Sequence, residues 1–205
     1  MTQRLIVGIT GASGAVYALN LLRELIRHPL EIHVVTTPDG RQVAAHELGG
    51  KGRLVEMVQA QGAAVTHPQA RLREHPPDSF FAPPASGSFR HHGMVVVPCS
   101  MKTLAAVAGG TAENLLTRAA DICLKERRPL VLVPRETPLS LIHLENMVRI
   151  TRAGGVILPP APGFYHRPAA VEDLVNFVVA RILDQLGIRH QLLAEWGNGD
   201  DADSL

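Results

Sequence analysis

The sequence is poor in the residue patterns that build disulfide frameworks and metal sites. It holds two cysteines in 205 residues, Cys99 and Cys123, without a CxxC spacing. This usage excludes a framework of several disulfides and favours a reducing cytoplasm. The ten histidines form no HExxH pattern or other ligand spacing, so nothing supports a metal centre. We expect no Cys99–Cys123 disulfide, and we interpret Cys99 as a buried thiol because no histidine is spaced to activate it.

The sequence also lacks long hydrophobic runs and a large excess of charge. No stretch approaches the roughly 20 apolar residues that span a bilayer. Glycines interrupt the apolar run that follows Arg4, so a strand with a glycine turn explains it better than a secretory signal. Twenty Lys+Arg against 19 Asp+Glu give a net charge of +1, which argues against binding nucleic acid through bulk charge. We expect a soluble protein without membrane or nucleic-acid partners, in which any anion site is local.

Apolar runs alternate with amphipathic patterns along the chain, which predicts alternating strands and helices. Strands are expected at residues 5–9, 31–36, 94–97, 130–133 and 156–158. Helices are expected at residues 15–26, 42–48, 54–60, 113–127, 139–151 and 171–186, with another beginning after Ser100. Continuous apolar strands between helices indicate a parallel sheet covered on both faces. The predicted fold class is α/β, a Rossmann-like three-layer sandwich with a mainly parallel sheet, in a single domain of residues 1–196 followed by a frayed acidic tail, 197–205.

One segment, residues 71–89, is rich in proline and serine and also carries Phe80, Phe81 and Phe89. It is too long for a simple connector and too apolar for a free linker. We expect a loop that packs against another part of the protein, and its phenylalanines suit a contact between subunits because such a patch should not stay exposed.

The turn after the first expected strand is rich in glycine. Gly8, Gly11 and Gly14 have G-x-x-G-x-x-G spacing rather than the dinucleotide spacing G-x-G-x-x-G. Free amides and the dipole of the following helix favour a phosphate there, while tight packing alone is the alternative. The second strand is followed by Thr37, whose hydroxyl suits a mononucleotide, although Asp39 keeps an NAD site open.

The third expected strand is followed by Ser100, Lys102 and Thr103 at the start of a helix. Two hydroxyls, an amine and free amides make a second possible anion cradle. An ordinary N-cap is the alternative.

Charged residues also follow the strand at 130–133, which ends on Arg135 and Glu136. In open α/β sheets ligands bind outside the carboxyl ends of the strands, so these charges are candidates for function. The alternative is a salt bridge beside a solvated helix face that carries Arg118 and Lys125. Arg181 lies at the edge of an apolar helical stripe, where arginines usually extend their charged end to solvent.

Four blocks of sequence carry a family resemblance: GITGASG at 8–14, PCSMKT at 98–103, RAADICLKERRPLVLVPRETPLSLIHLENM at 118–147 and PGFYHRP at 162–168. In this order and near these spacings they resemble the UbiX-type flavin prenyltransferases. The resemblance reaches about Trp196, and PRETP followed by HLENM points to the prenyltransferase branch of the flavin-binding decarboxylase-like proteins.

The resemblance implies an enzyme that joins a dimethylallyl group from dimethylallyl monophosphate to N5 and C6 of reduced FMN. The product, prenylated FMN, would serve a UbiD-type decarboxylase, and the enzyme would be a homo-oligomer, often a dodecamer, with sites completed by neighbouring subunits. The positions that match flavin-binding residues are Gly11, Ala12, Ser13, Thr37, Ser100, Met101, Lys102, Thr103 and Arg135. Those that match groups holding the prenyl phosphate are Lys125, Tyr165 and Arg181, and those that match acidic residues of the reaction site are Glu47 and Glu136.

Two features bear on this expected chemistry. The dense acidic run is confined to residues 200–203, so we expect ionisation of the prenyl phosphate without a metal, with fixed cations stabilising the leaving group. Thr37 stands where relatives usually have serine, and Pro38-Asp39-Gly40 stands where Lys-Ala-Ala often follows, so weaker or reshaped flavin binding is expected there. A flavin-dependent cysteine decarboxylase of the same fold and a noncatalytic FMN carrier or accessory subunit are the alternative functions.

Overall fold

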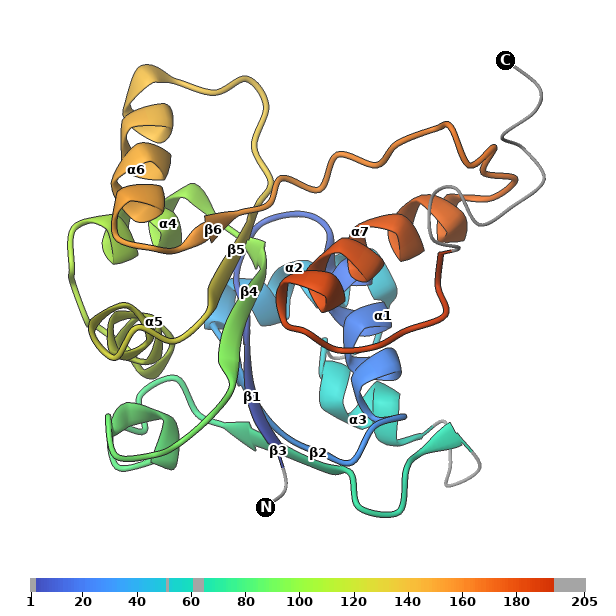
Figure 1. Ribbon diagram of the computed structural model, residues 1–205, viewed down its shortest axis with the longest axis horizontal. Coiled ribbons are helices and arrows are strands. Elements are labelled where there is room, and N and C mark those ends of the chain that lie inside the picture. Colours follow the sequence, from blue (N-terminus) through green and yellow to red (C-terminus); the bar gives the residue numbers. More distant parts are fainter. Residues whose placement is uncertain (1–2, 51, 61–64, 194–205) are drawn as a thin grey trace.

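A computed structural model describes residues 3–50, 52–60 and 65–193 and contains one six-stranded sheet (Figure 1). All strand pairs are parallel, and the strand order is β3-β2-β1-β4-β5-β6. The strands are β1 Gln3–Ile9, β2 Leu30–Thr36, β3 Arg71–His75, β4 Gly93–Cys99, β5 Leu130–Pro134 and β6 Val156–Ile157. Because the order runs outward in opposite directions from β1 and β4, the carboxyl ends of these two strands form the switch point where open α/β sheets bind ligands.

Helices cover both faces of the sheet. They are α1 Ala15–Leu25, α2 Pro38–Leu48, α3 Leu54–Gln59, α4 Met101–Ala108, α5 Leu115–Lys125, α6 Leu141–Arg152 and α7 Val171–Gln185, with a short 3-10 turn, η2 Pro83–Ala85. Figure 1 shows α1 and α7 on one side of the sheet and α4, α5 and α6 on the other. The predicted three-layer α/β architecture, a single domain across the described residues, is therefore confirmed.

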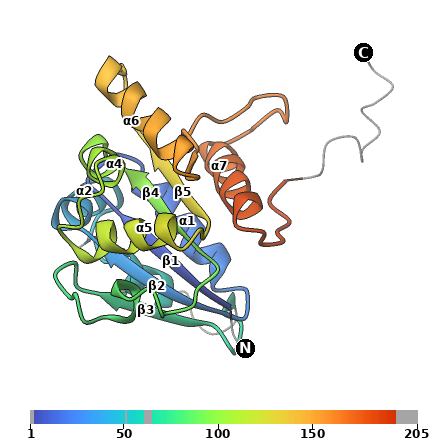
Figure 2. The same cartoon turned by 60° about the vertical axis from the view of Figure 1, so that its left-hand side comes forward.

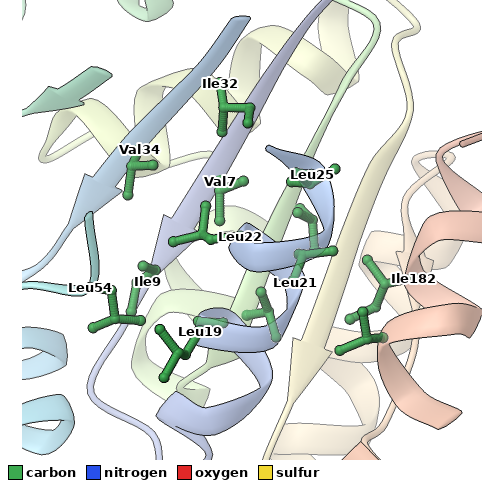
Figure 3. Packing of buried hydrophobic residues seen from close by; sticks show 14 of the residues in the cluster. Val7, Ile9, Leu19, Leu21, Leu22, Leu25, Ile32, Val34, Leu54 and Ile182 are labelled. Atoms are coloured by element: carbon green, nitrogen blue, oxygen red, sulfur yellow. The ribbon is translucent and has the colours of Figure 1, made fainter. Parts of the chain in front are cut away.

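The alternation of side chains along each strand produces two separate cores. Val7 and Ile9 of β1 belong to one hydrophobic cluster together with Leu22 of α1 and Ile182 of α7, part of which Figure 3 shows. Ile6, which immediately precedes Val7, points to the other face and joins the cluster around α4 and α5. Side chains one residue apart on a strand point to opposite faces, so each apolar run feeds both cores at once.

The prediction that residues 71–89 form only a loop is wrong at its beginning. Arg71–His75 is β3, an edge strand paired in parallel with β2. It contributes a single aliphatic side chain, Leu72, so it lacks the hydrophobic run that marks a buried strand. Charged residues on an edge strand discourage pairing with another sheet, and they also hide the strand from a hydrophobicity pattern.

The rest of that segment packs as expected. The Phe89 ring meets His33 of β2 edge-on at a centroid distance of 4.9 Å. Arg128 donates to the carbonyl oxygens of Gly87 and Phe89, both at 2.7 Å. Phe81, by contrast, is fully exposed. The subunit contact expected from this segment therefore needs a second copy of the chain to cover the Phe81 ring.

Other boundaries differ from the predictions by a few residues. The second helix begins at Pro38 rather than residue 42, because Thr37 caps it. The long helix begins at Leu115 rather than 113, since Asn114 is its cap. The expected tail, 197–205, lies outside the described residues.

Both cysteines are free thiols inside the protein. Burial raises the pKa of Cys99 and the pKa of Cys123 to about 12 each. The interpretation of Cys99 as an inert buried thiol fits this environment, because thiolates are the reactive form. Within the described ranges, no helix has both the length and the apolar character needed to cross a membrane.

Candidate active site at the carboxyl edge of the sheet

Three glycines, one near the end of β1 and two in the turn that follows it, are each required for a different structural reason. A Cβ on Gly8 would lie 2.9 Å from Leu116 Cδ1, so this glycine lets α5 approach the sheet. A Cβ on Gly11 would lie 2.5 Å from Asp39 Cβ, so this one lets the start of α2 approach the turn. Gly14 has φ of 113° and caps α1, a backbone conformation that L side chains rarely adopt. Close packing and backbone conformation therefore account for all three glycines, whether or not the turn also binds a ligand.

A carboxylate of the protein itself, rather than of a ligand, occupies the N-terminus of α1. Glu47, in the last turn of α2, accepts hydrogen bonds from the backbone nitrogens of Gly14 (3.0 and 3.1 Å) and Ala15 (2.8 Å). Burial alone would raise the pKa of Glu47, but hydrogen bonds from the Ser13 side chain and these two amides, with the charge of Arg135, hold it below its usual value. The amides expected to favour a phosphate here thus hold a glutamate instead.

Two other helices begin at the same edge with hydroxyl caps. The Thr37 Oγ1 accepts from the Gly40 nitrogen at 3.1 Å, and the Ser100 Oγ accepts from the Thr103 nitrogen at 3.2 Å. Thr10 ties the turns together, since its hydroxyl donates to the Pro98 carbonyl at 2.8 Å and accepts from the Ser100 nitrogen at 2.7 Å. The N-cap reading of Ser100 is confirmed, and the cap also faces the cavity described next.

A cavity of about 360 Å³ opens between these helix starts. Five predicted flavin-binding residues line it: Gly11, Thr37, Ser100, Lys102 and Thr103. Its volume lies within the range of about 300–1,000 Å³ that is typical of small-molecule sites. Its donors, two hydroxyl caps and one amine, suit a phosphate-bearing ligand.

Sequence reasoning missed much of the cavity wall. Besides Pro38 and Asp39, residues from two distant segments complete it: Pro77, Asp78, Phe80, Glu113 and Asn114. The Leu115 nitrogen donates to the Pro77 carbonyl at 2.7 Å, which joins the two segments. The available signals were the apolar character of the 71–89 segment and the capping pattern of Asn114 with Thr117. Three carboxylates and one amine line the cavity, so its wall is acidic overall.

Arg135 and Glu136 follow β5 at the carboxyl edge, as predicted. The Arg135 backbone nitrogen donates to the Cys99 carbonyl at 3.2 Å, and its charge acts on Glu47. The exposed Glu136 accepts from the Thr137 nitrogen at 3.1 Å. Ser13, Glu47 and Arg135 therefore interact at one place, while Ala12 is buried and Met101 half-buried in the adjoining turns.

Tyr165 and Arg181 are both associated with α7. The Tyr165 ring packs edge-on against Phe177, with ring centroids 5.9 Å apart. Arg181 lies one helical turn beyond Phe177 and pairs with Asp184 at 2.6 Å, with 53% of its side chain exposed. Residues four apart on a helix share a side, so the two predicted phosphate-binding groups lie along the same stretch of α7.

Lys125 lies elsewhere. It ends α5 just before β5 begins, at the amino edge of the sheet, where it pairs with Glu126. A Cβ on Gly87 would lie 3.0 Å from its Nζ, so the 71–89 segment is its neighbour. Strand β5 separates it from Arg135 by about 16 Å, and α5 and α7 lie on opposite faces of the sheet (Figure 1). A single chain does not gather Lys125 with Tyr165 and Arg181.

Comparisons with known proteins agree over nearly the whole chain. The family model described as Flavoprotein matches residues 1–183. A flavin prenyltransferase UbiX of Pseudomonas aeruginosa is 49% identical over 201 residues, 95% of this chain and 94% of that protein. Among solved structures, AnUbiX (PadA1) in complex with FMN and dimethylallyl pyrophosphate is 40% identical with a TM-score of 0.87, covering 98% of this chain and 100% of that one.

Two further structures bear on assembly and on the alternative function. A dodecameric FMN-dependent Ubix-like decarboxylase from Escherichia coli O157:H7 is 45% identical with a TM-score of 0.85, covering 95% of this chain and 99% of that one. The FMN-dependent cysteine decarboxylase TvaF, which covers 91% of this chain and 99% of its own, is 16% identical with a TM-score of 0.59. At that identity the likeness shows a shared fold alone.

Proposed function

The chain belongs to the Flavoprotein family and, within it, to the UbiX-type flavin prenyltransferases, and on this premise we propose that it prenylates reduced FMN. The donor is dimethylallyl monophosphate, and the new bonds form at N5 and C6 of the flavin. When bound, reduced FMN supplies these two nucleophilic positions. The product serves a UbiD-type decarboxylase, and the free buried thiols suit the cytoplasm predicted from cysteine usage.

One observation carries the proposal: a fixed carboxylate stands beside a cavity of cofactor size at the β1–β4 switch point. Glu47 is held ionised by backbone amides and by Ser13 and Arg135. Prenyl transfer to a flavin ring releases a proton, so it needs a base with a fixed position. Glu47 suits this role because it is ionised in the free protein. Glu136, which follows β5 at the same edge of the sheet, is the second carboxylate for proton movement.

The remaining assignments follow from charge. The α1 amides are occupied by Glu47, so we assign the phosphate of FMN to the start of α4, where Ser100, Lys102 and Thr103 line the cavity. Breaking the allylic C–O bond leaves negative charge on the donor phosphate, which fixed cations and donors stabilise. Tyr165 and Arg181 supply these on α7, and Lys125 reaches the same phosphate from a neighbouring subunit.

This last step requires an oligomer. Because Lys125 lies on the face of the sheet opposite α7, it can meet Tyr165 and Arg181 only if another copy contributes it. The helix α6 offers a surface for such assembly, since Leu141 and Ile142 are each 69% exposed. We propose a homododecamer, like the Escherichia coli structure.

Mass spectrometry of the flavin tests the proposal. The protein is incubated anaerobically with reduced FMN and dimethylallyl monophosphate in the presence of a chelator. In parallel it is incubated with the diphosphate bound in the related structure, once with the chelator and once with magnesium. We expect the flavin mass to rise by one prenyl unit with the monophosphate. An unchanged mass with both donors would contradict flavin prenyl transfer, and turnover only with the diphosphate and magnesium would contradict the metal-independent monophosphate reaction.

Two further incubations, one with a cysteinyl peptide and oxidised FMN and one with FMN alone, separate the alternatives. A cysteine decarboxylase would turn over a cysteinyl peptide with oxidised FMN, whereas a carrier would bind FMN tightly without changing its mass. In the carrier, Glu136→Gln would leave function intact. In the prenyltransferase, this variant loses activity by about 10² or more, as is usual when a general acid or base is removed.

A further inference from the structure

Three aromatic rings form a cluster where the chain enters α7. Phe177, which is 9% exposed, is the central ring. His166 stacks on it with a centroid distance of 5.3 Å and an interplanar angle of 13°. Tyr165 meets it edge-on at 5.9 Å and 76°, and the His166 and Tyr165 rings are 6.1 Å apart at 78°. One buried ring therefore contacts two consecutive side chains of the preceding segment.

The backbone around the cluster is fixed on both sides. A Cβ on Gly163 would lie 2.7 Å from Tyr165 Cε1 and 3.3 Å from Phe177 Cζ, so the tyrosine ring packs directly on the glycine. On the other side, Asp173 accepts from the nitrogens of Ala169 (2.8 Å) and Ala170 (2.9 Å) at the start of α7. The segment thus holds Tyr165 while leaving 64% of it exposed.

His166 contributes its ring to this cluster and no hydrogen bond among the described residues. Both ring nitrogens are out of contact with solvent and have no partner in that part of the chain. Because neither nitrogen has a hydrogen-bond partner there, packing holds the imidazole in place. The unpaired nitrogens themselves disfavour the folded state. What the imidazole provides is a flat ring that is nearly perpendicular to the ring of Tyr165.

We propose that His166 is a positioning residue for prenyl transfer: stacked on Phe177, it fixes the angle at which Tyr165 meets the phosphate of the prenyl donor. This inference rests on the proposed function. His166 acts through Tyr165 and does not itself touch the donor. Arg181, one turn further along α7, marks the direction in which that phosphate lies, so a rotation of the Tyr165 ring would separate the two groups that hold it.

Steady-state kinetics with reduced FMN at saturation test this role. We expect His166→Ala to raise KM for dimethylallyl monophosphate on the order of tenfold, with a smaller effect on kcat, because it misplaces a group that binds the donor. His166→Phe keeps the stack and should stay within about twofold of the wild type, the scatter expected for an uncoupled change. In a Tyr165→Phe background, His166→Ala should add no more than about twofold, because the two residues act as one unit.

Two controls keep the test decisive. His166→Phe removes two unpaired buried nitrogens, so its melting temperature should not fall below that of the wild type. Phe177→Leu removes the surface on which both rings pack, so it should raise KM as His166→Ala does. An unchanged KM in His166→Ala, an effect that adds fully to that of Tyr165→Phe, or a loss in His166→Phe equal to that in His166→Ala would each overturn the proposal.

A readout without turnover separates this inference from the proposed function. The chain has two tyrosines, Tyr17 and Tyr165, so fluorine NMR of fluorotyrosine-labelled protein gives two signals. His166→Ala should shift or broaden the Tyr165 signal, while His166→Phe should leave it close to the wild type. If the wild type transfers no prenyl group but the signal responds in this way, the proposed function fails and the positioning of Tyr165 stands. A Tyr165 signal that ignores His166→Ala overturns the positioning role whether or not the enzyme is active.

Discussion

The carboxylate of Glu47 lies 2.8 Å from the backbone nitrogen of Ala15, at the N-terminus of α1. The two residues are 32 apart in the chain and belong to different helices. The positive end of the helix dipole favours an anion at this place. Because a side chain of the protein supplies that anion, the glycine turn holds a carboxylate in a fixed position, and the proposed function assigns the phosphate of FMN to the start of another helix.

Glu47→Gln should lower both activity and stability. Loss of an ionised group at the helix N-terminus is expected to cost about 1 kcal/mol of unfolding free energy, since the site is partly exposed. Loss of a positioned base should lower kcat by about 10² or more. Thermal unfolding and the flavin mass assay measure these effects. Glu56→Gln, which changes a glutamate in a surface pair with Arg53, should change neither by a comparable amount.

The stability that Glu47 provides should also depend on pH. Hydrogen bonds hold its pKa below the ordinary value of 4.5 in the folded protein. A group with a lowered folded pKa stabilises the fold above its unfolded pKa and loses that contribution as the pH falls through the folded value. Wild type and Glu47→Gln should therefore differ in unfolding free energy at pH 7 and converge below about pH 4.5. A constant difference between pH 7 and pH 3 would contradict the assignment.

Asp39→Ala should strengthen FMN binding relative to riboflavin. Asp39 lines the cavity with two other carboxylates and a single amine, Lys102, so it opposes the charge of the FMN phosphate. An exposed charge interaction is worth up to about 1 kcal/mol, which corresponds to a change of up to about fivefold in the FMN dissociation constant. Fluorescence quenching titrations of both flavins measure the ratio. Glu172→Ala, which removes the same charge at the start of α7, should leave that ratio unchanged.

Two buried histidines should make the protein less stable in weak acid. Burial, and next the charge of His75, lower the pKa of His33 to about 4, although Glu31 opposes this. Burial lowers the pKa of His91 to about 4 as well. Both are neutral in the folded protein and bind protons more readily when unfolded, so stability is complete above about pH 6.5 and falls toward pH 4.

Urea unfolding at a series of pH values between 7 and 5 measures this loss. Each histidine contributes a slope of up to about 1.4 kcal/mol per pH unit in this window. His91→Phe should reduce the slope, whereas His46→Gln, which changes an exposed histidine of α2, should retain it. A slope that is the same in all three proteins would contradict the role of His91.

The sequence reveals those parts of the fold that one local pattern determines. Apolar runs identify β1, β2, β4 and β5, and the hydroxyls of Thr37 and Ser100 identify helix starts that face the cavity. The edge strand β3 is not predicted from the sequence, because its one aliphatic side chain is too weak a signal for a strand. The hydrogen bond that the Ala15 nitrogen donates to Glu47 is not evident from the sequence, because it depends on how α2 packs against α1, which no local pattern encodes.

The position of Lys125 shows a different limit. In the sequence Lys125 lies shortly before Arg135 and Glu136, and the segment suggests that all three charges line one side of a single site. In the fold, β5 carries the chain from one edge of the sheet to the other between Lys125 and Arg135. Proximity in sequence across a strand therefore means separation in space, and only the three-dimensional arrangement shows that Lys125 lies apart from Tyr165 and Arg181 within one chain.

Ile142→Asp should dissociate the oligomer and abolish prenyl transfer together. The outer side of α6 exposes Leu141, Ile142, Leu144 and Val148, and α6 projects from the rest of the molecule at the top of Figure 2. A charge on this surface cannot be buried in an interface without a partner. Light scattering should show smaller particles than the wild type, and flavin mass should stay unchanged because Lys125 no longer reaches Tyr165 and Arg181. Flavin binding through Ser100 and Thr103, which lie within one chain, should persist in part.

Gln59→Asp is the matched control for this variant. It also places an aspartate on an exposed helical position, in α3 rather than on the apolar surface of α6, so assembly and activity should be retained. Full activity in a dissociated Ile142→Asp protein would contradict a site shared between subunits, because one chain would then suffice. An intact oligomer that has lost activity would place the effect of Ile142 within the subunit. Only the joint loss of assembly and turnover, with FMN binding partly retained, supports a donor site that takes Lys125 from one copy and Arg181 from another.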